Sequence, residues 1–409
     1  GTVVLGVGVL LIPFLPYIVS GELPSEVNLY GLYIIYLSNT VLSYWLFAYK
    51  TALLNAHQRN DLVSKISSIV FLTKYLLQFI VLLLFKNYYA YAIIIPLTTL
   101  LSNVGSAFIA EKYYPQYKCR GEIEKEEKSE IREKVTALLY NKIGVAIING
   151  SDNIVISTFL GLRMLGIYSS YYYIFSMLHS FFDVFHSAIT AGIGNSIVIE
   201  KIETNYTLFE RLNFINTWIV GWCAICLCCL YQPFMYIWVG RDATLPVGFS
   251  IIMSIYFYFW MIRFITLIFK NAQGLWRQDR FRSLLEGLFN LVLNLCLVKK
   301  IGIYGITIST VVAMLIVSLP WETNVLFKHY FNKSPKHYYI ETVLRFILML
   351  VIGMFTYFLC MLINAGEWGT LVLRALICIV LPNVIIMFVY RKTDNFDYAK
   401  KMLVRIIKR

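Results

Sequence analysis

Charged residues are scarce in this chain. Only 14% of the 409 residues are Asp, Glu, Lys or Arg, whereas 59% are hydrophobic and the mean hydropathy is +0.67. This composition lies far outside the range of soluble domains, so the sequence predicts an integral membrane protein. The net charge of +13 does not indicate a nucleic-acid partner, because the positions of the loops explain it better.

Several catalytic signatures are also missing. The sequence contains no G-x-x-x-x-G-K-[ST] loop, no H-E-x-x-H and no G-x-S-x-G, which excludes P-loop ATP hydrolysis and two classes of hydrolase. The loops outside the membrane are short, the largest being 232–246. A membrane glycan polymerase or ligase would need larger ones, so it is the less favoured alternative. We expect no enzymatic activity and no cofactor.

The eight cysteines do not form a disulfide framework. Four of them, Cys223, Cys226, Cys228 and Cys229, lie in one apolar run that contains no His or carboxylate. Cysteine in such a run packs as a small apolar residue. We therefore expect no metal or redox site there.

Long apolar runs predict an all-α bundle. Runs able to cross about 30 Å of hydrocarbon occur at 2–19, 29–49, 63–85, 88–110, 135–160, 165–194, 208–231, 248–270, 281–298, 303–327, 338–363 and 368–390, giving 12 transmembrane helices. Segments 49–58 and 269–278 share a short sequence pattern, Lys-x-Ala followed by Gln six residues after the Ala. The pattern pairs the second span with the eighth, which indicates an internal repeat of six spans. Two further spans are then expected before Gly1, about 14 in all.

The basic residues of the loops orient these spans. If Gly1 lies in the cytosol, 24 Lys and Arg fall in cytosolic loops and the tail, against five outside. The positive-inside rule therefore predicts that both ends of this chain are cytosolic. The expected parts are an N-lobe with the last four of six helices (1–110), a charged cytosolic linker (111–134), a C-lobe of six helices (135–332), two extra helices (333–390) and a basic amphipathic tail (391–409).

Polar residues recur within the apolar spans. A charge at mid-bilayer costs roughly 2.5–3.5 kcal/mol, so such residues should face protein or water and are functional candidates. Aromatic rings suit sugar faces and fixed cations suit phosphates. The candidates for substrate binding in a cavity are Lys74, Lys142, Asn149, His179, Tyr256, Trp260, Arg263 and Lys270. The candidates for ion coupling are Asp152, Asp183 and Glu286.

Purely structural roles for the same residues remain as alternatives. Arg263 is as well explained by a structural ion pair with a carboxylate such as Glu286. The spacing of His179, Asp183 and His186 is compatible with a metal site, but a hydrated cavity face is favoured, with hydrogen bonding between helices as a further alternative. No metal is predicted.

Several motifs resemble one known family. The segments 152–161 and 165–171, together with Tyr114-Pro115-x-Tyr117 and the glycines of 300–305, are similar to bacterial polysaccharide flippases. These are the Wzx-like (O-antigen) members of the multidrug/oligosaccharidyl-lipid/polysaccharide (MOP) exporter superfamily, which is MATE-like. The resemblance implies two six-helix lobes around a central cavity, often followed by two extra helices.

The resemblance also implies a function. We expect a flippase that moves undecaprenyl-pyrophosphate-linked oligosaccharide across the bacterial cytoplasmic membrane by alternating access, for export of capsule or lipopolysaccharide. Lys74, Lys142, Arg263 and Lys270 would then contact pyrophosphate or acidic sugars. Membrane lipids are expected partners, and a polysaccharide polymerase and other assembly proteins are candidate partners. The main rival is an ion-coupled drug or metabolite exporter of the same fold.

Overall fold

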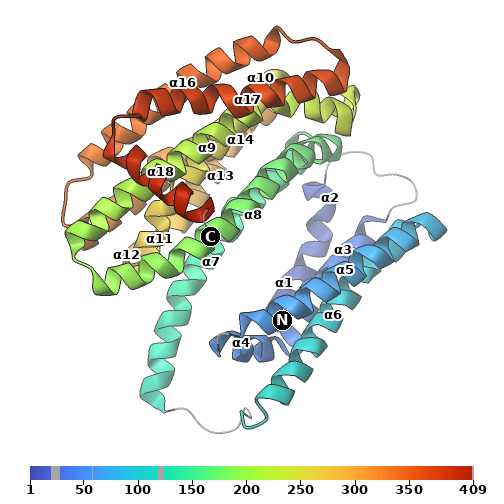
Figure 1. Cartoon of the computed structure of the whole chain (residues 1–409). Coiled ribbons are helices and arrows are strands. Elements are labelled where there is room, and N and C mark those ends of the chain that lie inside the picture. The colour runs from blue at the N-terminus through green and yellow to red at the C-terminus, as the bar shows by residue number, and fades with distance from the viewer. Residues whose placement is uncertain (20–27, 58, 118–123, 408–409) are drawn as a thin grey trace. The chain divides into compact units, whose positions relative to one another are not determined.

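The computed structural model describes residues 1–19, 28–57, 59–117 and 124–407, and all regular elements in these ranges are helical. This confirms the predicted all-α class. The chain divides into two compact units, Gly1–Glu127 and Lys128–Arg409, and most of their α-helices are labelled in Figure 1. A few side chains within these ranges, including that of the predicted cavity residue Asn149, lie outside the described part.

The first unit is a small helical bundle. Its elements are α1 (Thr2–Leu11), η1 (Ile12–Phe14), α2 (Leu15–Ile18), α3 (Leu29–Trp45), α4 (Ala48–Ala56), α5 (Asn60–Phe85) and α6 (Tyr88–Tyr113). Asn28 and Asn87 begin α3 and α6 because each side-chain carbonyl accepts hydrogen bonds from two backbone N–H groups of the first turn. Between α3 and α4 the path bends by 48°, where Phe47 adopts a left-handed backbone conformation.

The second unit holds the remaining helices. They are α7 (Lys125–Phe159), which begins just before the division, α8 (Leu162–Ile199), α9 (Ile202–Trp238), η2 (Arg241–Ala243), α10 (Val247–Ile262), α11 (Phe264–Ala272), α12 (Trp276–Asp279), α13 (Arg282–Ile301), α14 (Ile303–Ala313), η3 (Met314–Ser318), α15 (Leu319–Leu326), η4 (Phe327–Phe331), α16 (Lys336–Met361), α17 (Gly366–Tyr390) and α18 (Asp394–Ile407).

Two glycines of the family-like motifs make the tight turns of this unit. Gly161 separates α7 from α8 with φ 85°, and Gly302 separates α13 from α14 with φ 59°, a region that other residues enter at a cost. Gly305 has a packing role instead, because a Cβ there would lie 2.8 Å from the Leu297 carbonyl oxygen. These glycines let α13 and α14 form a close antiparallel pair.

Nine helices of the described ranges are long and apolar enough to cross a membrane, or ten if the bent pair α3 and α4 is one span. The helix at Thr2–Ile18 is apolar but shorter than the others. Polar residues in its sequence keep α7 out of this group, although its second half coincides with the expected span 135–160. The chain is therefore a multi-pass membrane protein, and the count of 12 stays a prediction.

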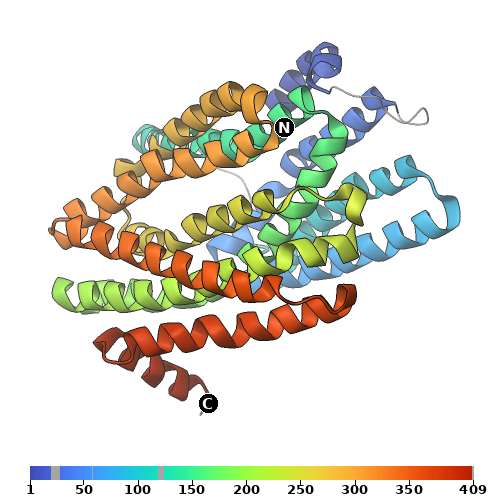
Figure 2. The ribbon, with the colours of Figure 1, turned by 90° about the horizontal axis from the view of Figure 1, so that it is seen from above.

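The core of the second unit is centred on α9, α10 and α14. Phe249, Phe257 and Ile306 are fully buried there, and α16 and α17 pack against α9 (Figures 1 and 2). Outward-facing side chains of α16 and α17 are apolar and exposed, as Met354 and Val380 show. Such a surface suits contact with lipid chains rather than water.

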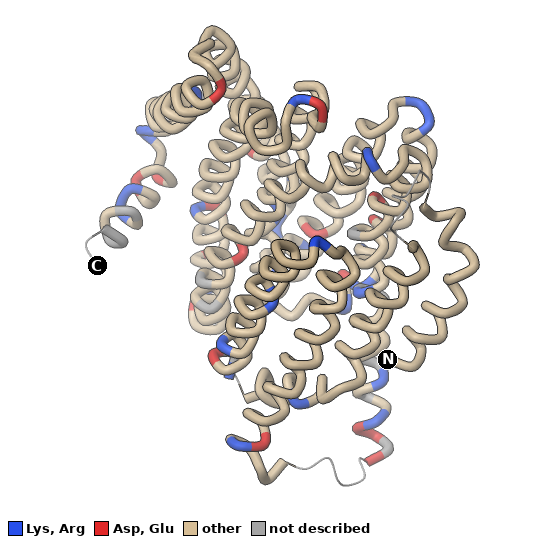
Figure 3. The backbone as a smooth tube through the Cα atoms, turned by 90° about the vertical axis from the view of Figure 1, so that its right-hand side faces the viewer, with Lys and Arg blue, Asp and Glu red and all other residues tan. Residues whose placement is uncertain are grey.

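Figure 3 shows where the charged residues lie along the backbone. Many Lys, Arg, Asp and Glu residues gather near helix ends and connections, while a smaller number lie within the helices of the second unit. The latter group is the starting point for the functional site, since buried charges in a membrane protein must be paired or functional.

Candidate functional site

A buried ion-pair network connects four helical segments of the second unit. Arg263, at the break between α10 and α11, donates from Nε to Glu322 Oε2 at 2.9 Å and from a terminal nitrogen to Glu322 Oε1 at 2.6 Å. Its other terminal nitrogen lies 3.7 Å from Glu286 Oε1. This two-pronged pairing is the strong form of an arginine–carboxylate contact.

Arg282 extends the network toward α12. Its guanidinium lies 2.8 Å from Glu286, 3.1 Å from Glu322 and 3.2 Å from Asp279. Lys270 pairs with Asp279 on the far side. The network thus contains three cations and three carboxylates, and this balance lowers the cost of removing the charges from water.

Irregular helix geometry brings these residues together. Arg263 lies where α10 gives way to α11, and Arg282 also donates to the hydroxyl of Ser318 at 3.0 Å. Ser318 ends the π-helical turn η3, and π-turns within longer helices occur frequently at functional sites. The helices therefore depart from regular form at the points where charges meet.

A second polar cluster joins α7, α13 and α14. Asp152 accepts a hydrogen bond from Asn294 Nδ2 at 2.7 Å and another from Thr310 Oγ1 at 3.2 Å. Asn290 Nδ2 donates to Thr310 Oγ1 at 3.0 Å, and Ser151 Oγ donates to Asn290 Oδ1 at 3.0 Å. Within the described residues no cation lies within 4 Å of Asp152, so neutral groups surround a single carboxyl.

Close packing of α7 on α13 makes this cluster possible. A Cβ at Gly144 would lie 2.4 Å from the Leu284 backbone nitrogen, and a Cβ at Gly287 would lie 3.1 Å from the Gly144 carbonyl oxygen. The hydrogen-bonded residues of the cluster, Ser151 and Asp152 on α7 and Asn290 and Asn294 on α13, lie one to two turns beyond these glycines. The paired glycines therefore let short side chains such as Ser151 reach across the interface.

An aromatic face on α8 and α10 borders the ion-pair network. The ring of His179 lies 6.0 Å from Trp260 and 5.5 Å from Phe264, and its Nδ1 lies 3.1 Å from Asp183. The guanidinium of Arg263 lies 5.8 Å from the ring centre of Trp260. Trp260 and Arg263, two of the residues expected to bind substrate, are thus neighbours in the structure.

His186 does not complete a metal site with His179 and Asp183. It is buried, its Nε2 lies 3.1 Å from Asn216 Oδ1, and its ring stacks on Phe264 at 4.4 Å. Asp183 is about half exposed beside His179. His179 and Asp183 therefore form a partly exposed pair, whereas His186 makes a buried hydrogen bond between helices. The contact of His186 fits the hydrogen-bonding alternative.

The four basic residues expected to meet the substrate have different local surroundings. Arg263 and Lys270 are both within the ion-pair network, with exposures of 5% and 1%, so substrate contact with them requires the network to open. Lys142 is exposed on α7. Lys74 belongs to the first unit, where its ammonium group lies 4.4 Å from the ring centre of Tyr75.

Sequence reasoning did not single out Asp279, Arg282 or Glu322. Arg282 lies at the edge of the expected span 281–298, and its side chain is only 11% exposed and contacts all three carboxylates. Two sequence features could have identified these residues. Arg282 and Glu286 have i,i+4 spacing, and Glu322 is a single carboxylate in an apolar run. Their partners come from distant parts of the chain, which spacing alone does not reveal.

The fold is that of a multi-pass membrane protein with buried polar clusters among its helices. Residues 1–189 match the family described as "Polysaccharide biosynthesis protein". The chain is also similar to the solved structure "Lipid II flippase MurJ, inward closed conformation", with a TM-score of 0.68 and 15% identity over 95% of this chain and 81% of that chain. The chain therefore has the fold of that structure, and its first 189 residues resemble the polysaccharide biosynthesis family. No curated protein sequence matches the chain.

Proposed function

We propose that this protein flips a lipid-linked oligosaccharide, carried on undecaprenyl pyrophosphate, from the cytosolic to the outer leaflet of a bacterial cytoplasmic membrane. The match of residues 1–189 to a polysaccharide biosynthesis family on a flippase fold carries the proposal. Alternating access would move the substrate, and both ends of this chain would face the cytosol. A polysaccharide polymerase is the expected neighbour in the assembly pathway.

The second unit offers chemistry for both parts of such a substrate. An apolar cavity of about 160 Å³ lies between α9, α10 and α16, lined by residues that include Gly221, Tyr258 and Met349. It suits a segment of a polyprenyl chain. Trp260 and Tyr256 provide rings for sugars, and Arg263 would provide a cation for phosphate once the ion-pair network opens.

The cluster around Asp152 supports ion coupling. Its members Ser151, Asn290, Asn294 and Thr310 present oxygen atoms beside one carboxylate, and Asn294 Oδ1 is buried without a hydrogen-bond partner among the described residues. Oxygen ligands suit hard cations, and one negative charge is neutralised by one monovalent ion. Na⁺ bound at Asp152 is therefore the coupling event we propose, with proton binding as the alternative.

A deletion strain tests the transport function. Loss of the gene should abolish surface glycan and cause lipid-linked repeat units to accumulate on the cytosolic side, and the wild-type gene should restore both. Normal surface glycan without such accumulation would overturn the proposal. Gradient-driven extrusion of small organic cations by the purified protein would instead favour the exporter of drugs or metabolites.

Charge-neutral variants test the coupling site. In vesicles with independent Na⁺ and pH gradients, Asp152→Asn should abolish the dependence of transport on Na⁺. The matched variant Asp183→Asn changes a half-exposed carboxylate that pairs with His179 and should keep that dependence. If Asp152→Asn leaves both the Na⁺ and the pH profile unchanged, Asp152 is not the coupling group.

A further inference from the structure

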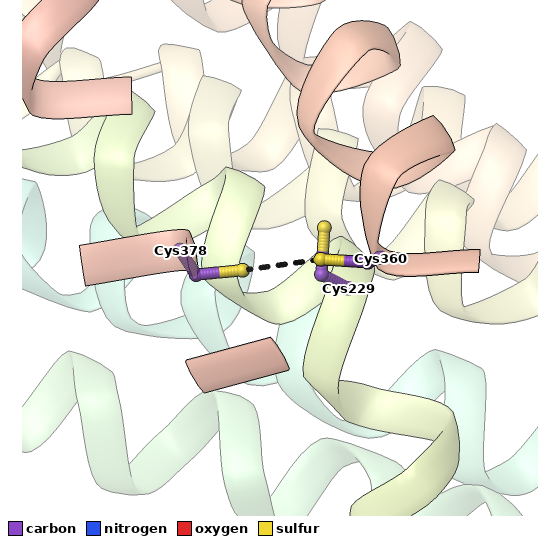
Figure 4. A group of neighbouring side chains, drawn as sticks. All are labelled: Cys229, Cys360 and Cys378. Carbon is purple, nitrogen blue, oxygen red and sulfur yellow. Dashed lines mark hydrogen bonds between the residues drawn. The ribbon is translucent and has the colours of Figure 1, made fainter. Parts of the chain in front are cut away.

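Three cysteines from three helices meet in the interior of the second unit. Cys229 of α9, Cys360 of α16 and Cys378 of α17 place their sulfur atoms within 4.8 Å of one another, as Figure 4 shows. The Sγ atoms of Cys360 and Cys378 are 3.9 Å apart. Each of the three residues is at most 1% exposed. The convergence is tertiary, since Cys229 and Cys360 lie 131 positions apart in the chain.

This spacing fits a metal bound by three thiolates. Zinc–sulfur bonds are about 2.3 Å long, so three sulfurs in a plane around the ion would lie about 4.0 Å apart. The observed separation of 3.9 Å between Cys360 and Cys378 agrees with that edge. We propose that Cys229, Cys360 and Cys378 form a binding site for a thiophilic divalent metal ion, Zn²⁺ in the first instance.

The charge around the site favours a divalent ion over a monovalent one. Arg374 lies one turn before Cys378 on the same face of α17, and its Nε is buried without a hydrogen-bond partner among the described residues. Three thiolates, one guanidinium and a divalent cation sum to zero, whereas a monovalent cation would leave one negative charge. Net charge inside an apolar bundle is costly, so the neutral combination is preferred.

A metal here would fasten the last two long helices to the body of the unit. It would link α16 and α17 to α9, adding to the hydrogen bond from Trp222 Nε1 to the Cys378 carbonyl oxygen at 2.8 Å. Sequence reasoning excluded a metal because the run 223–229 contains no other ligand type. The structure supplies Cys360 and Cys378 instead, and thiolates alone satisfy soft metal ions.

Cobalt substitution in the wild-type protein is the decisive experiment. The full chain, purified in detergent with reduced thiols, should bind one equivalent of Co²⁺ with the intense near-ultraviolet absorption of sulfur-to-cobalt charge transfer. Zn²⁺ should displace Co²⁺ and raise the unfolding temperature. Absence of the charge-transfer band, or a Cys360–Cys378 disulfide in protein purified without reductant and no metal uptake after reduction, would overturn the proposal.

Variants locate the site. Cys378→Ser should weaken Zn²⁺ binding by more than about 100-fold, while the control Cys296→Ser, which removes the exposed cysteine of α13, should bind as the wild type does. Arg374→Gln should weaken binding by about tenfold, and Arg374→Lys should restore it. Equal zinc binding by Cys378→Ser and Cys296→Ser would refute the assignment of these ligands.

Discussion

Removing the charge of Glu322 should destabilise the second unit more than any other single charge-neutral change at the network. Glu322 is 1% exposed, accepts two hydrogen bonds from Arg263 and lies 3.1 Å from Arg282. In Glu322→Gln the amide NH₂ would face a guanidinium and three cations would share two carboxylates. Breaking a buried pair in this way costs about 3–5 kcal/mol.

The remaining contacts place the expected value at the lower end of that range. Arg263 keeps Glu286 at 3.7 Å, and Arg282 keeps Asp279 and Glu286. We therefore expect Glu322→Gln to lower the free energy of unfolding by about 3 kcal/mol. The measurement is reversible denaturation in mixed micelles, followed by tryptophan fluorescence and far-ultraviolet circular dichroism.

A matched control and a double variant make the reasoning refutable. Glu367→Gln removes the partner of Arg241 in a pair that is exposed on both sides and should cost about 0.5 kcal/mol or less. Adding Arg263→Gln to Glu322→Gln restores the charge balance and should recover at least about 1 kcal/mol relative to the single variant. A loss in Glu322→Gln no larger than in Glu367→Gln, or no recovery in the double variant, would show that the network does not act as a balanced unit.

Three further changes test the remaining features. Gly144→Ala should lower the free energy of unfolding by about 1–3 kcal/mol and weaken the Na⁺ dependence of transport, because the new Cβ would meet the α13 backbone. The control Gly150→Ala places a Cβ where no other atom lies within 4 Å. It should be neutral or stabilising in the same denaturation assay. Asn294→Ala removes the 2.7 Å donor to Asp152 and should raise the Na⁺ concentration for half-maximal transport by about tenfold, whereas a value unchanged from the exposed-site control Ser180→Ala would contradict this role. In a background with Cys119→Ser and Cys296→Ser, Lys400→Cys should react with an impermeant maleimide only in permeabilised cells and Lys299→Cys in intact cells. The reverse pattern would invert the proposed topology.

Much of the site was visible in the sequence as residue types but not as contacts. Asp152 stood out because an apolar span excludes such a side chain without a reason, and its partner in the structure is Asn294. Their hydrogen bond depends on the approach of α7 to α13 at Gly144 and Gly287. Residues 142 positions apart cannot be paired by periodicity, since helical spacing relates only neighbours within a turn or two.

The sequence by itself determined the class of this protein. Its hydropathy and the lengths of its apolar runs lead to an all-helical membrane protein, because the bilayer leaves few alternatives to a spanning helix. Only the tertiary structure decided the partners of the buried groups. Arg263 meets Glu322, and Cys229 meets Cys360 and Cys378, since such contacts depend on which helices pack together and at what rotation.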